Sequence, residues 1–360
     1  MGIEPREMAE KTLRLRAAAR NDDGFFSTFV LRKISRIFTS ALVETRIKPN
    51  TVTSISIIFG LLAAYVASQG KYFVGAVALL FSLVLDCVDG EIARYKSQFS
   101  LLGAWLDALA DRIKEFAYIG ALIYSVDEER IWWLGIALII LQTLRHLSDY
   151  NFVRLQKEYE ESKTNPNRSG VIYWLKKIIH FPIGERWLLL AVLPLVSSIE
   201  QTLQLLLLFG IFSFMYVILS RARRITRWPV REVDSRFLLM QRDTLLPFPI
   251  SGSRISWTLP SFLRGCEFFA LLVIPLDVAP VVRFVLITAI ALWHYTNLYD
   301  ALHGSTSTYM GAGLRMAGRI SLCLLAFLIG FDLEISLLLS FYLLGLIIIR
   351  GGHNVAKGVA

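Results

Sequence analysis

Four aspartates, Asp86, Asp89, Asp107 and Asp111, stand inside two otherwise apolar segments of this 360-residue chain. On helices, Asp86 and Asp89 lie close together around one turn, and Asp107 and Asp111 form one stripe. A carboxylate in the apolar part of a membrane is costly unless it faces protein or water and has a partner. Four together therefore call for cations, and hard divalent ions with oxygen ligands match this donor set.

The chemistry that such acids support is phosphoryl-type transfer. Two divalent ions on shared carboxylates bind phosphate oxygens, neutralise developing charge and align the attacking and leaving groups. A carboxylate beside them can accept a hydroxyl proton within hydrogen-bonding distance. Gly90 and Ala93 lack bulk, so a ligand can approach the backbone, and Gly103 lets two helices pack closely. Arg94 is suited either to a phosphate or to the membrane interface.

The composition indicates a membrane protein. Hydrophobic residues make up 55% of the chain, the mean hydropathy is +0.53 and the formal net charge is +9. This average is too apolar for a soluble domain and predicts an all-α, polytopic membrane protein. Cys87, Cys266 and Cys323 lack metal-ligand spacing and are expected to be reduced packing residues. We expect no cleaved signal peptide and no nucleic-acid partner.

Ten apolar runs predict ten helical spans. They cover about residues 51–69, 72–96, 101–125, 131–150, 185–199, 202–220, 262–275, 279–299, 316–330 and 333–349. Lysines and arginines concentrate in the connections on one side, which predicts a cytoplasmic N-terminus. All four aspartates then lie in the cytoplasmic half of their spans, where a water-soluble nucleotide reaches them.

The pattern divides the chain into four parts. Residues 1–48 mix basic with aromatic and aliphatic side chains, which favours an amphipathic helix on the membrane surface; a solvated helical tail is the alternative. Residues 49–224 form the transmembrane core that carries the aspartates. Residues 225–261 are rich in turn formers and predict a cytoplasmic linker. Residues 262–360 add about four transmembrane helices whose role the sequence does not indicate.

The acidic pattern resembles a known family signature. It reads D-x2-D-G-x2-A-R-x8-G-x3-D-x3-D from Asp86 to Asp111, and it matches the CDP-alcohol phosphotransferases (CDP-alcohol phosphatidyltransferases) at every fixed position. Residues 49–53, Pro-Asn-Thr-Val-Thr, also resemble the start of that family's first transmembrane helix. The resemblance extends over residues 25–224 and implies a six-helix core, to which the C-terminal helices are an addition.

The resemblance also implies residue roles. Asp86, Asp89, Asp107 and Asp111 would hold two magnesium or manganese ions, and Asp111 would also be the general base. The CDP pocket would be lined by Asn50, Thr53, Gly90, Ala93 and Arg94. The reaction would be attack of an alcohol on the CDP-linked phosphate, with release of CMP, in phospholipid or phosphodiester biosynthesis. The family further implies a homodimer.

The substrates remain open at this level. The donor is either CDP-diacylglycerol, giving phosphatidyl transfer, or a soluble CDP-alcohol such as CDP-inositol. The segment 182–186, Pro-Ile-Gly-Glu-Arg, is similar to the entry of the fifth span in members related to the di-inositol-phosphate phosphate synthases. A competing interpretation from another class is a cation or proton transporter that uses the same acids.

Three arginines are candidates for a phosphorylated acceptor. Arg145, Arg186 and Arg221 stand at the cytoplasmic ends of the fourth, fifth and sixth predicted spans. The planar guanidinium group donates two parallel hydrogen bonds to a phosphate. They equally fit the role of positive-inside anchors. We expect an integral, multi-pass protein of a prokaryotic cell membrane with its site facing the cytoplasm and the lipid bilayer as its surroundings.

Overall fold

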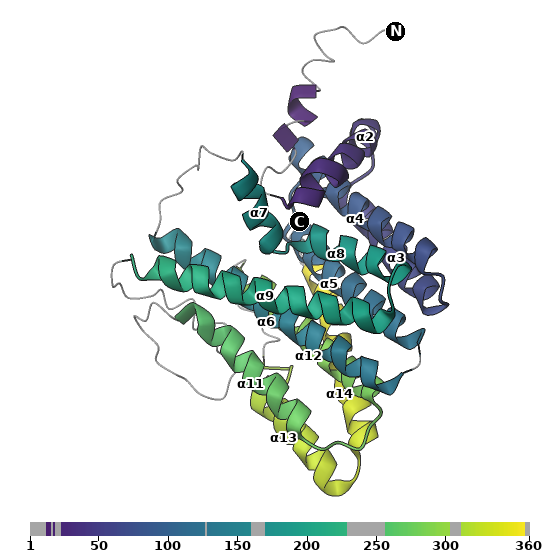
Figure 1. Ribbon diagram of the computed structural model, residues 1–360, viewed down its shortest axis with the longest axis vertical. Helices are drawn as coiled ribbons and strands as arrows, with labels where there is room; N and C mark the ends of the chain where they lie inside the picture. Colours follow the sequence, from purple (N-terminus) through teal and green to yellow (C-terminus); the bar gives the residue numbers. More distant parts are fainter. Residues whose placement is uncertain are drawn as a thin grey trace. The chain divides into compact units, whose positions relative to one another are not determined.

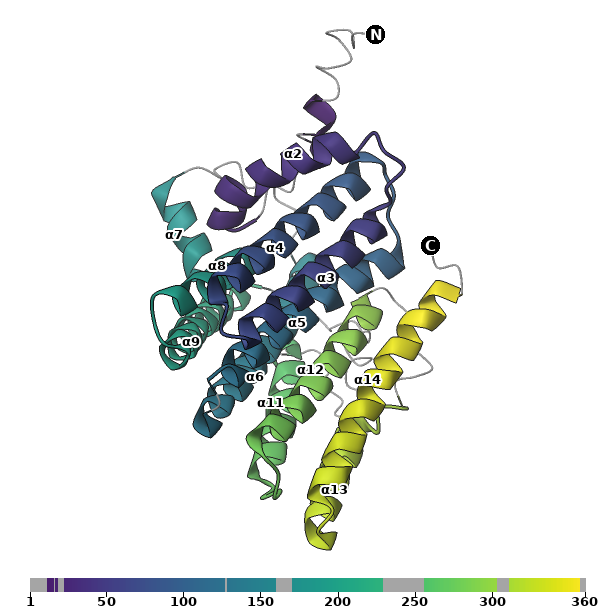
Figure 2. The same cartoon turned by 90° about the vertical axis from the view of Figure 1, so that its right-hand side faces the viewer.

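The computed structural model describes residues 12–15, 17–18, 23–126, 128–159, 170–228, 256–302 and 311–356. All regular secondary structure in these ranges is helical (Figure 1 and Figure 2). This confirms the all-α prediction for the described part of the chain. Most of the predicted linker, residues 229–255, lies outside the described residues, as do residues 1–11 of the N-terminal segment.

The chain divides into two compact units, which are described separately. One comprises Met1–Asp127, Ser169–Thr202 and Val355–Ala360, and the other Glu128–Arg168 and Leu203–Asn354. We call them the motif unit and the C-terminal unit. The division crosses the predicted core of residues 49–224, because the helices that contain Arg145 and Arg221 group with the C-terminal helices.

The motif unit is organised around α3. Its helices are α2 (Arg32–Leu42), preceded by the π-helical turn η1 (Ser27–Leu31), then α3 (Pro49–Ser68), α4 (Tyr72–Tyr95), α5 (Leu101–Tyr124), α7 (Val171–Ile179) and α8 (Ile183–Val192), which ends in the 3-10 turn η2 (Leu193–Leu195). Helix α3 packs against both α4 and α5, and α2 and α8 pack against α4.

Local signals start and stop these helices. Pro49 is the first residue of α3, where its fixed φ suits the helix and its missing N–H is not needed. Gly70, with φ of 74°, forms the tight turn to α4. Ser100 caps α5 by accepting a hydrogen bond from the Gly103 backbone N–H at 2.9 Å. These signals fix where the aspartate-bearing turns begin.

The C-terminal unit is built on α6. It contains α6 (Glu129–Tyr159), most of α9 (Ile199–Ile225), α11 (Leu259–Val273) after the 3-10 turn η3 (Ser256–Thr258), α12 (Pro280–Leu302), α13 (Arg315–Ile329) and α14 (Asp332–Ala356). Helix α6 packs against α11 and α12. His146 and Tyr150 of α6 hydrogen-bond the hydroxyls of Tyr295 and Tyr299 of α12 at 2.6 and 2.8 Å.

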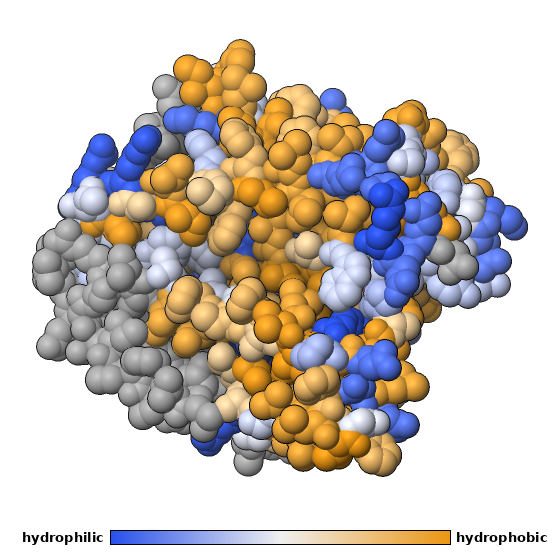
Figure 3. All heavy atoms as spheres, turned by 60° about the horizontal axis from the view of Figure 1, so that its bottom comes forward, coloured by the Kyte–Doolittle hydropathy of each residue, from blue (hydrophilic) through white to orange (hydrophobic). Residues whose placement is uncertain are grey.

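Six described helices are long and apolar enough to cross a membrane. They are Pro49–Ser68, Tyr72–Tyr95, Glu129–Lys157, Ile199–Ile225, Pro280–Tyr299 and Asp332–Gly351, and the pair Val171–Ile179 and Ile183–Leu195, bent by 68°, makes a seventh candidate. Exposed apolar side chains cover much of the face in Figure 3, as a protein in contact with lipid requires.

Among the described residues, six or seven candidates meet these criteria of length and composition, against ten predicted spans. Helices α11 and α13 have 15 residues each, or about 22 Å, against a hydrocarbon core of about 30 Å. Helix α5 has 24 residues, but its length includes Asp107, Asp111, Arg112, Lys114 and Glu115. Arg112, Lys114 and Glu115 form ion pairs inside the protein, which hydropathy alone does not reveal.

Helix α2 has its polar side facing the protein. Arg32, Ser35 and Thr39 are buried, whereas Ile34 and Ile37 are exposed. The exposed face also includes Lys33 and Arg36, and a face that mixes basic with apolar side chains fits a membrane surface. This arrangement supports the predicted interfacial position of the N-terminal segment, which stays a prediction.

Candidate metal centre

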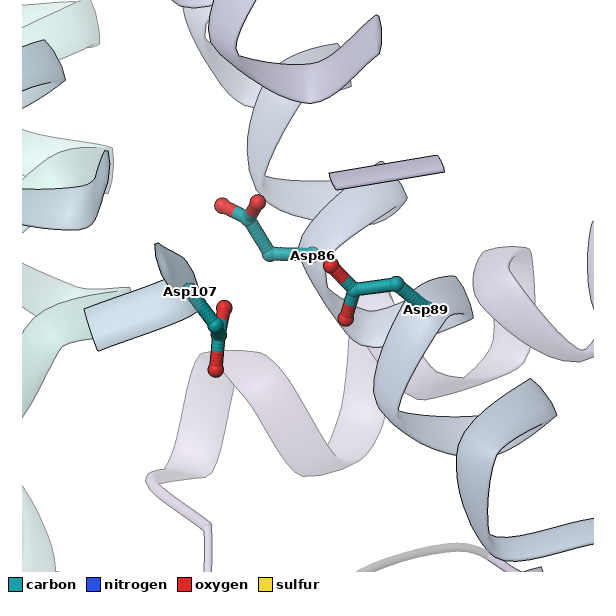
Figure 4. A group of neighbouring side chains, drawn as sticks. All are labelled: Asp86, Asp89 and Asp107. Carbon is teal, nitrogen blue, oxygen red and sulfur yellow. The ribbon is translucent and has the colours of Figure 1, made fainter. Parts of the chain in front are cut away.

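Three of the four predicted aspartates come together. Asp86 and Asp89 project from α4 and Asp107 from α5, and one carboxylate oxygen of each lies within 4.8 Å of the others (Figure 4). Asp89 is buried, and Asp86 and Asp107 are half-buried. Three converging carboxylates in a poorly solvated space repel one another strongly unless a cation lies between them. The donor set, all carboxylate oxygen, suits magnesium or manganese.

Hydroxyl groups of α3 hold two of these carboxylates in place. Thr53 Oγ1 donates to Asp89 Oδ2 at 2.5 Å, and Ser56 Oγ donates to Asp86 Oδ1 at 2.6 Å. The two hydroxyls are three residues apart and therefore lie on one face of α3. Thr53 was predicted to line the nucleotide pocket, whereas Ser56 was not predicted. Ser56 repeats the hydroxyl of Thr53 one turn later, but this spacing does not indicate which side chain it bonds.

A lysine that the sequence analysis missed lies beside the acids. Lys114 Nζ is 2.5 Å from Asp86 Oδ2, 2.9 Å from Ser56 Oγ and 3.4 Å from Asp111 Oδ1. Its side chain is fully buried. A Cβ atom on Gly60 would collide with the Lys114 side chain, so glycine at this position of α3 makes room for it. Lys114 therefore supplies one positive charge to the cluster.

Asp111 stands one helical turn beyond Asp107 and is not among the three converging carboxylates. Its Oδ1 atom is buried and has no hydrogen-bond partner among the described residues, and Lys114 Nζ is the cation that faces it, at 3.4 Å. An unbonded carboxylate oxygen is able to accept a proton, which is the property that a general base needs.

Glu91, the residue after Gly90 in the motif, anchors α2. Its carboxylate accepts hydrogen bonds from Ser35 Oγ at 2.9 Å and Thr39 Oγ1 at 2.6 Å, and Arg32 Nη1 lies 3.0 Å away. The glutamate side chain is almost fully buried. This contact fixes the turn of α4 that contains Asp89 and Gly90 against the N-terminal helices, and the sequence analysis did not predict it.

The remaining predicted nucleotide residues line the same region of α3 and α4. A Cβ atom on Gly103 would lie 2.7 Å from Asn50 Oδ1, so glycine permits the close approach of α5 to the start of α3. Arg94 folds back over Gly90, where an added Cβ would be 3.2 Å from Arg94 Nη1. Arg94 Nε also donates to the backbone carbonyl of Ala18. Ala93 is half-buried.

The three candidate acceptor arginines all have acidic partners. In the motif unit, Arg186 donates two hydrogen bonds to the buried Glu115, which also binds Arg112 at 2.9 Å. In the C-terminal unit, Arg221 Nη2 binds Asp149 Oδ1 at 2.5 Å, and Arg145 Nε lies 3.9 Å from Asp149 Oδ2. Each arginine thus has a structural partner in addition to any substrate role.

Together these features define a class: a helical membrane protein with a cluster of carboxylates between two helices that could hold a metal ion. Residues 46–222 match the model of a protein family described as CDP-alcohol phosphatidyltransferase. This match covers 177 of the 360 residues, just under half of the chain, and it is to the family whose signature the aspartates resemble.

Individual relatives are distant and partial. A bifunctional IPC transferase and DIPP synthase of Aquifex aeolicus is 36% identical over 119 residues, covering 32% of this chain and 27% of that protein. The phosphatidylinositol phosphate synthase of Mycobacterium marinum is 26% identical over 160 residues, covering 43% and 65%. A crystal structure of the Mycobacterium tuberculosis phosphatidylinositol phosphate synthase with CDP-DAG bound aligns with 21% identity and a TM-score of 0.36, covering 51% and 91%. The chain spans less than a third of the relatives named IPC transferase and DIPP synthase.

Proposed function

We propose that this protein is a membrane CDP-alcohol phosphotransferase. It transfers a substituted phosphate group from a CDP-linked donor to an alcohol and releases CMP. The observation that carries the proposal is the convergence of Asp86, Asp89 and Asp107 within the segment that matches the family model. In this proposal Asp86, Asp89, Asp107 and Asp111 are the ligands of divalent metal ions.

The metal supplies charge neutralisation at the donor diphosphate and alignment of the reacting groups. The protein keeps the ligands oriented: Thr53 and Ser56 fix the carboxylates of Asp89 and Asp86 through hydrogen bonds. Such partners of metal ligands restrict the carboxylate rotamers and so reduce the cost of assembling the site. Lys114 offsets part of the negative charge that four aspartates bring together.

The transfer is a substitution at phosphorus. The alcohol oxygen forms a new bond to the phosphorus of the transferred group, and the bond from that phosphorus to the CMP oxygen breaks. CMP leaves with the electron pair, and the hydroxyl proton passes to Asp111. The unbonded Oδ1 of Asp111 supports its role as the base. No covalent bond to the protein is needed.

The nucleotide would lie along α4 and the start of α3. Gly90 and Ala93 leave the helix backbone accessible, and Asn50, Thr53 and Arg94 provide polar groups around it. Arg145, Arg186 and Arg221 remain candidates for a phosphorylated acceptor, with Glu115 and Asp149 holding their guanidinium groups in position.

We favour CDP-diacylglycerol as the donor, which makes the reaction a phosphatidyl transfer. Relatives named phosphatidylinositol phosphate synthase support this choice. A soluble CDP-alcohol such as CDP-inositol is the second candidate. It is favoured by the higher identity, 35% and 36%, to proteins named IPC transferase and DIPP synthase and by the resemblance of residues 182–186.

The test is CMP release by purified protein with magnesium or manganese, comparing CDP-diacylglycerol with CDP-inositol across a panel of alcohols. We expect CMP from one donor and a loss of about 10²–10⁴-fold in Asp111→Asn, the range for a missing general base. Full activity of Asp111→Asn would remove its role as the base. Ion flux into sealed vesicles without CMP formation would instead support the transporter.

A further inference from the structure

The ammonium group of Lys114 is surrounded by oxygen atoms of the aspartate site. Its Nζ atom donates hydrogen bonds to Asp86 Oδ2 at 2.5 Å and to Ser56 Oγ at 2.9 Å, and it lies 3.4 Å from Asp111 Oδ1. The nitrogen thus has one oxygen neighbour for each of its protons, and two of these neighbours are carboxylates from different helices. The chain itself therefore provides a cation between Asp86 and Asp111.

The surrounding helices fix the lysine in this position. Its side chain is completely buried, and its methylene groups lie in the space that Gly60 of α3 leaves open. From α8, the ring of the buried Trp187 lies with its centroid 5.3 Å from the ammonium nitrogen, within the range of a cation–π contact. A lysine near the end of a membrane helix usually extends its ammonium group toward water. The enclosure of Lys114 therefore indicates a role at the aspartates.

Asp86 is shared between this lysine and the three converging carboxylates. One of its oxygens lies within 4.8 Å of oxygens of Asp89 and Asp107, and its Oδ2 atom binds Lys114. In sites with two divalent ions, which are about 3.5–4 Å apart, shared carboxylates hold both ions. Asp86 has the position of such a shared carboxylate, with an ammonium group as one of its two cations.

A second divalent ion at Asp86 and Asp111 would have to share this space with the ammonium group. Magnesium binds carboxylate oxygens at about 2.0–2.1 Å, so an ion on these two carboxylates would lie next to Lys114 Nζ. Like charges at such a distance repel strongly where water is excluded. The lysine has little room to withdraw, because Gly60 and Trp187 enclose it.

We propose that Lys114 occupies the second cation position of this site, so that the chain binds one divalent ion where the family resemblance implies two. That ion is held by Asp86, Asp89 and Asp107. The inference rests on the proposed metal-dependent function and narrows it, since Asp111 faces the ammonium group in place of a second ion and keeps its role as the base.

The test counts the ions that bind to the full chain. Purified protein in detergent is stripped with EDTA and dialysed against increasing manganese, and bound metal per protein is measured by mass spectrometry of the elements. We expect one ion per wild-type chain, with the electron paramagnetic resonance spectrum of an isolated manganese ion. Lys114→Met should bind two ions per chain, and their spins should couple because ions on a shared carboxylate are about 3.5–4 Å apart.

Three further variants control the count. Lys114→Gln also removes the charge and should bind two ions, as Lys114→Met does. Lys176→Met, at an exposed position of α7, should bind one ion like the wild type. Asp107→Asn should lose the tightly bound ion, which separates binding at the aspartates from adventitious binding elsewhere. Monodisperse elution in detergent shows whether each variant folds, and the wild-type count does not depend on any variant.

The outcomes separate this inference from the proposed function. Two coupled ions in the wild type would overturn the inference and leave the proposed function intact. A single ion in both folded Lys114 variants would also overturn it, because the lysine would then not be the group that excludes the second ion. Absence of bound manganese from the wild type would contradict the metal-dependent function itself, and the inference with it.

Discussion

Two clusters of buried charge, one in each unit, differ in how they are balanced. In the motif unit, the carboxylates of Asp86, Asp89 and Asp107 converge, and the ammonium group of Lys114 lies beside Asp86 and Asp111. In the C-terminal unit, one glutamate, Glu267, is surrounded by donors. Arg319 Nε lies 2.6 Å from its Oε1, and His294 Nε2 and Arg264 Nη1 lie 2.9 and 3.5 Å from its Oε2.

This difference distinguishes a candidate cation site, the aspartate cluster, from a structural ion-pair cluster around Glu267. The Glu267 cluster is complete, because α11, α12 and α13 each contribute a group that neutralises or hydrogen-bonds the carboxylate. Among the residues that the structure describes, the aspartate cluster has more negative charge than Lys114 alone balances. Buried charges are tolerated when they are paired, so the excess of carboxylates is the feature that requires an external cation. The following predictions test this contrast, beginning with the largest effect.

Asp107→Asn should lower the rate of CMP release by about 10³-fold or more, because a bound metal contributes several kcal/mol of charge stabilisation. The same change should leave the thermal stability in EDTA unchanged or raised, since it removes one of several like charges. Initial rates and unfolding midpoints in detergent measure the two effects. If the variant loses stability but keeps its rate of CMP release, Asp107 has a structural role instead.

Glu267→Gln should show the opposite pattern. Removing the charge that Arg319 and Arg264 share leaves buried cations uncompensated, which costs about 3–5 kcal/mol of unfolding free energy. The rate of CMP release per folded molecule should not change. Glu128→Gln is the matched control, because the Glu128–Arg130 pair is exposed and such pairs are worth about 0–1 kcal/mol. Equal effects of the two variants would show that the Glu267 cluster is not a stabilising unit.

The sequence indicated which helix faces the motif aspartates share because their spacing is local. Asp86 and Asp89 share a helix, as do Asp107 and Asp111, and the helical period sets their faces before any tertiary contact is known. The carboxylate oxygens of three of these side chains lie within 4.8 Å of one another. This approach depends on how the two helices pack, which the spacing alone does not determine. The family resemblance anticipated this convergence, whereas hydropathy counted α5 as an ordinary span.

The partners of the acids were not predictable in the same way. Ser56 meets Asp86 across 30 residues and Lys114 meets it across 28, while Glu267 and Arg319 are 52 residues apart. A serine in an apolar helix or a lysine beside an aspartate is common in many settings, so neither has a pattern that names its partner. Gly60 leaves room for Lys114, but glycine has many uses in membrane helices, so its presence does not identify the neighbour.

Lys114→Met should destabilise the metal-free protein by about 2 kcal/mol, the range for hydrogen bonds to charged groups. Saturating magnesium should remove most of this deficit, because a bound cation replaces the lost ammonium charge. Unfolding midpoints with magnesium and with EDTA give the comparison. Lys176→Met, at an exposed position of α7, controls for loss of a surface charge.

The same comparison of unfolding midpoints with magnesium and with EDTA also distinguishes the two clusters. Magnesium should not restore Glu267→Gln, since the Glu267 cluster has a single carboxylate and Arg319 and Arg264 beside it are already cations. Restoration of both variants, or of neither, would contradict the assignment of the cation requirement to the aspartates alone.

Ser56→Ala should have the smallest effect. The hydroxyl donates to Asp86 and accepts from Lys114, so its loss should cost about 1 kcal/mol of stability. The magnesium concentration for half-maximal turnover should rise about tenfold, the lower range for removing a partner of a metal ligand. Ser54→Ala is the matched control on α3, because Ser54 is exposed and bonds only the Asn50 carbonyl in the described structure. If both serine variants need the same magnesium concentration as the wild type, then the orientation of Asp86 does not depend on α3. The α3 hydroxyls would in that case stabilise helix packing, as His294 does beside Glu267. The aspartate cluster and the Glu267 cluster would then differ only in their net charge.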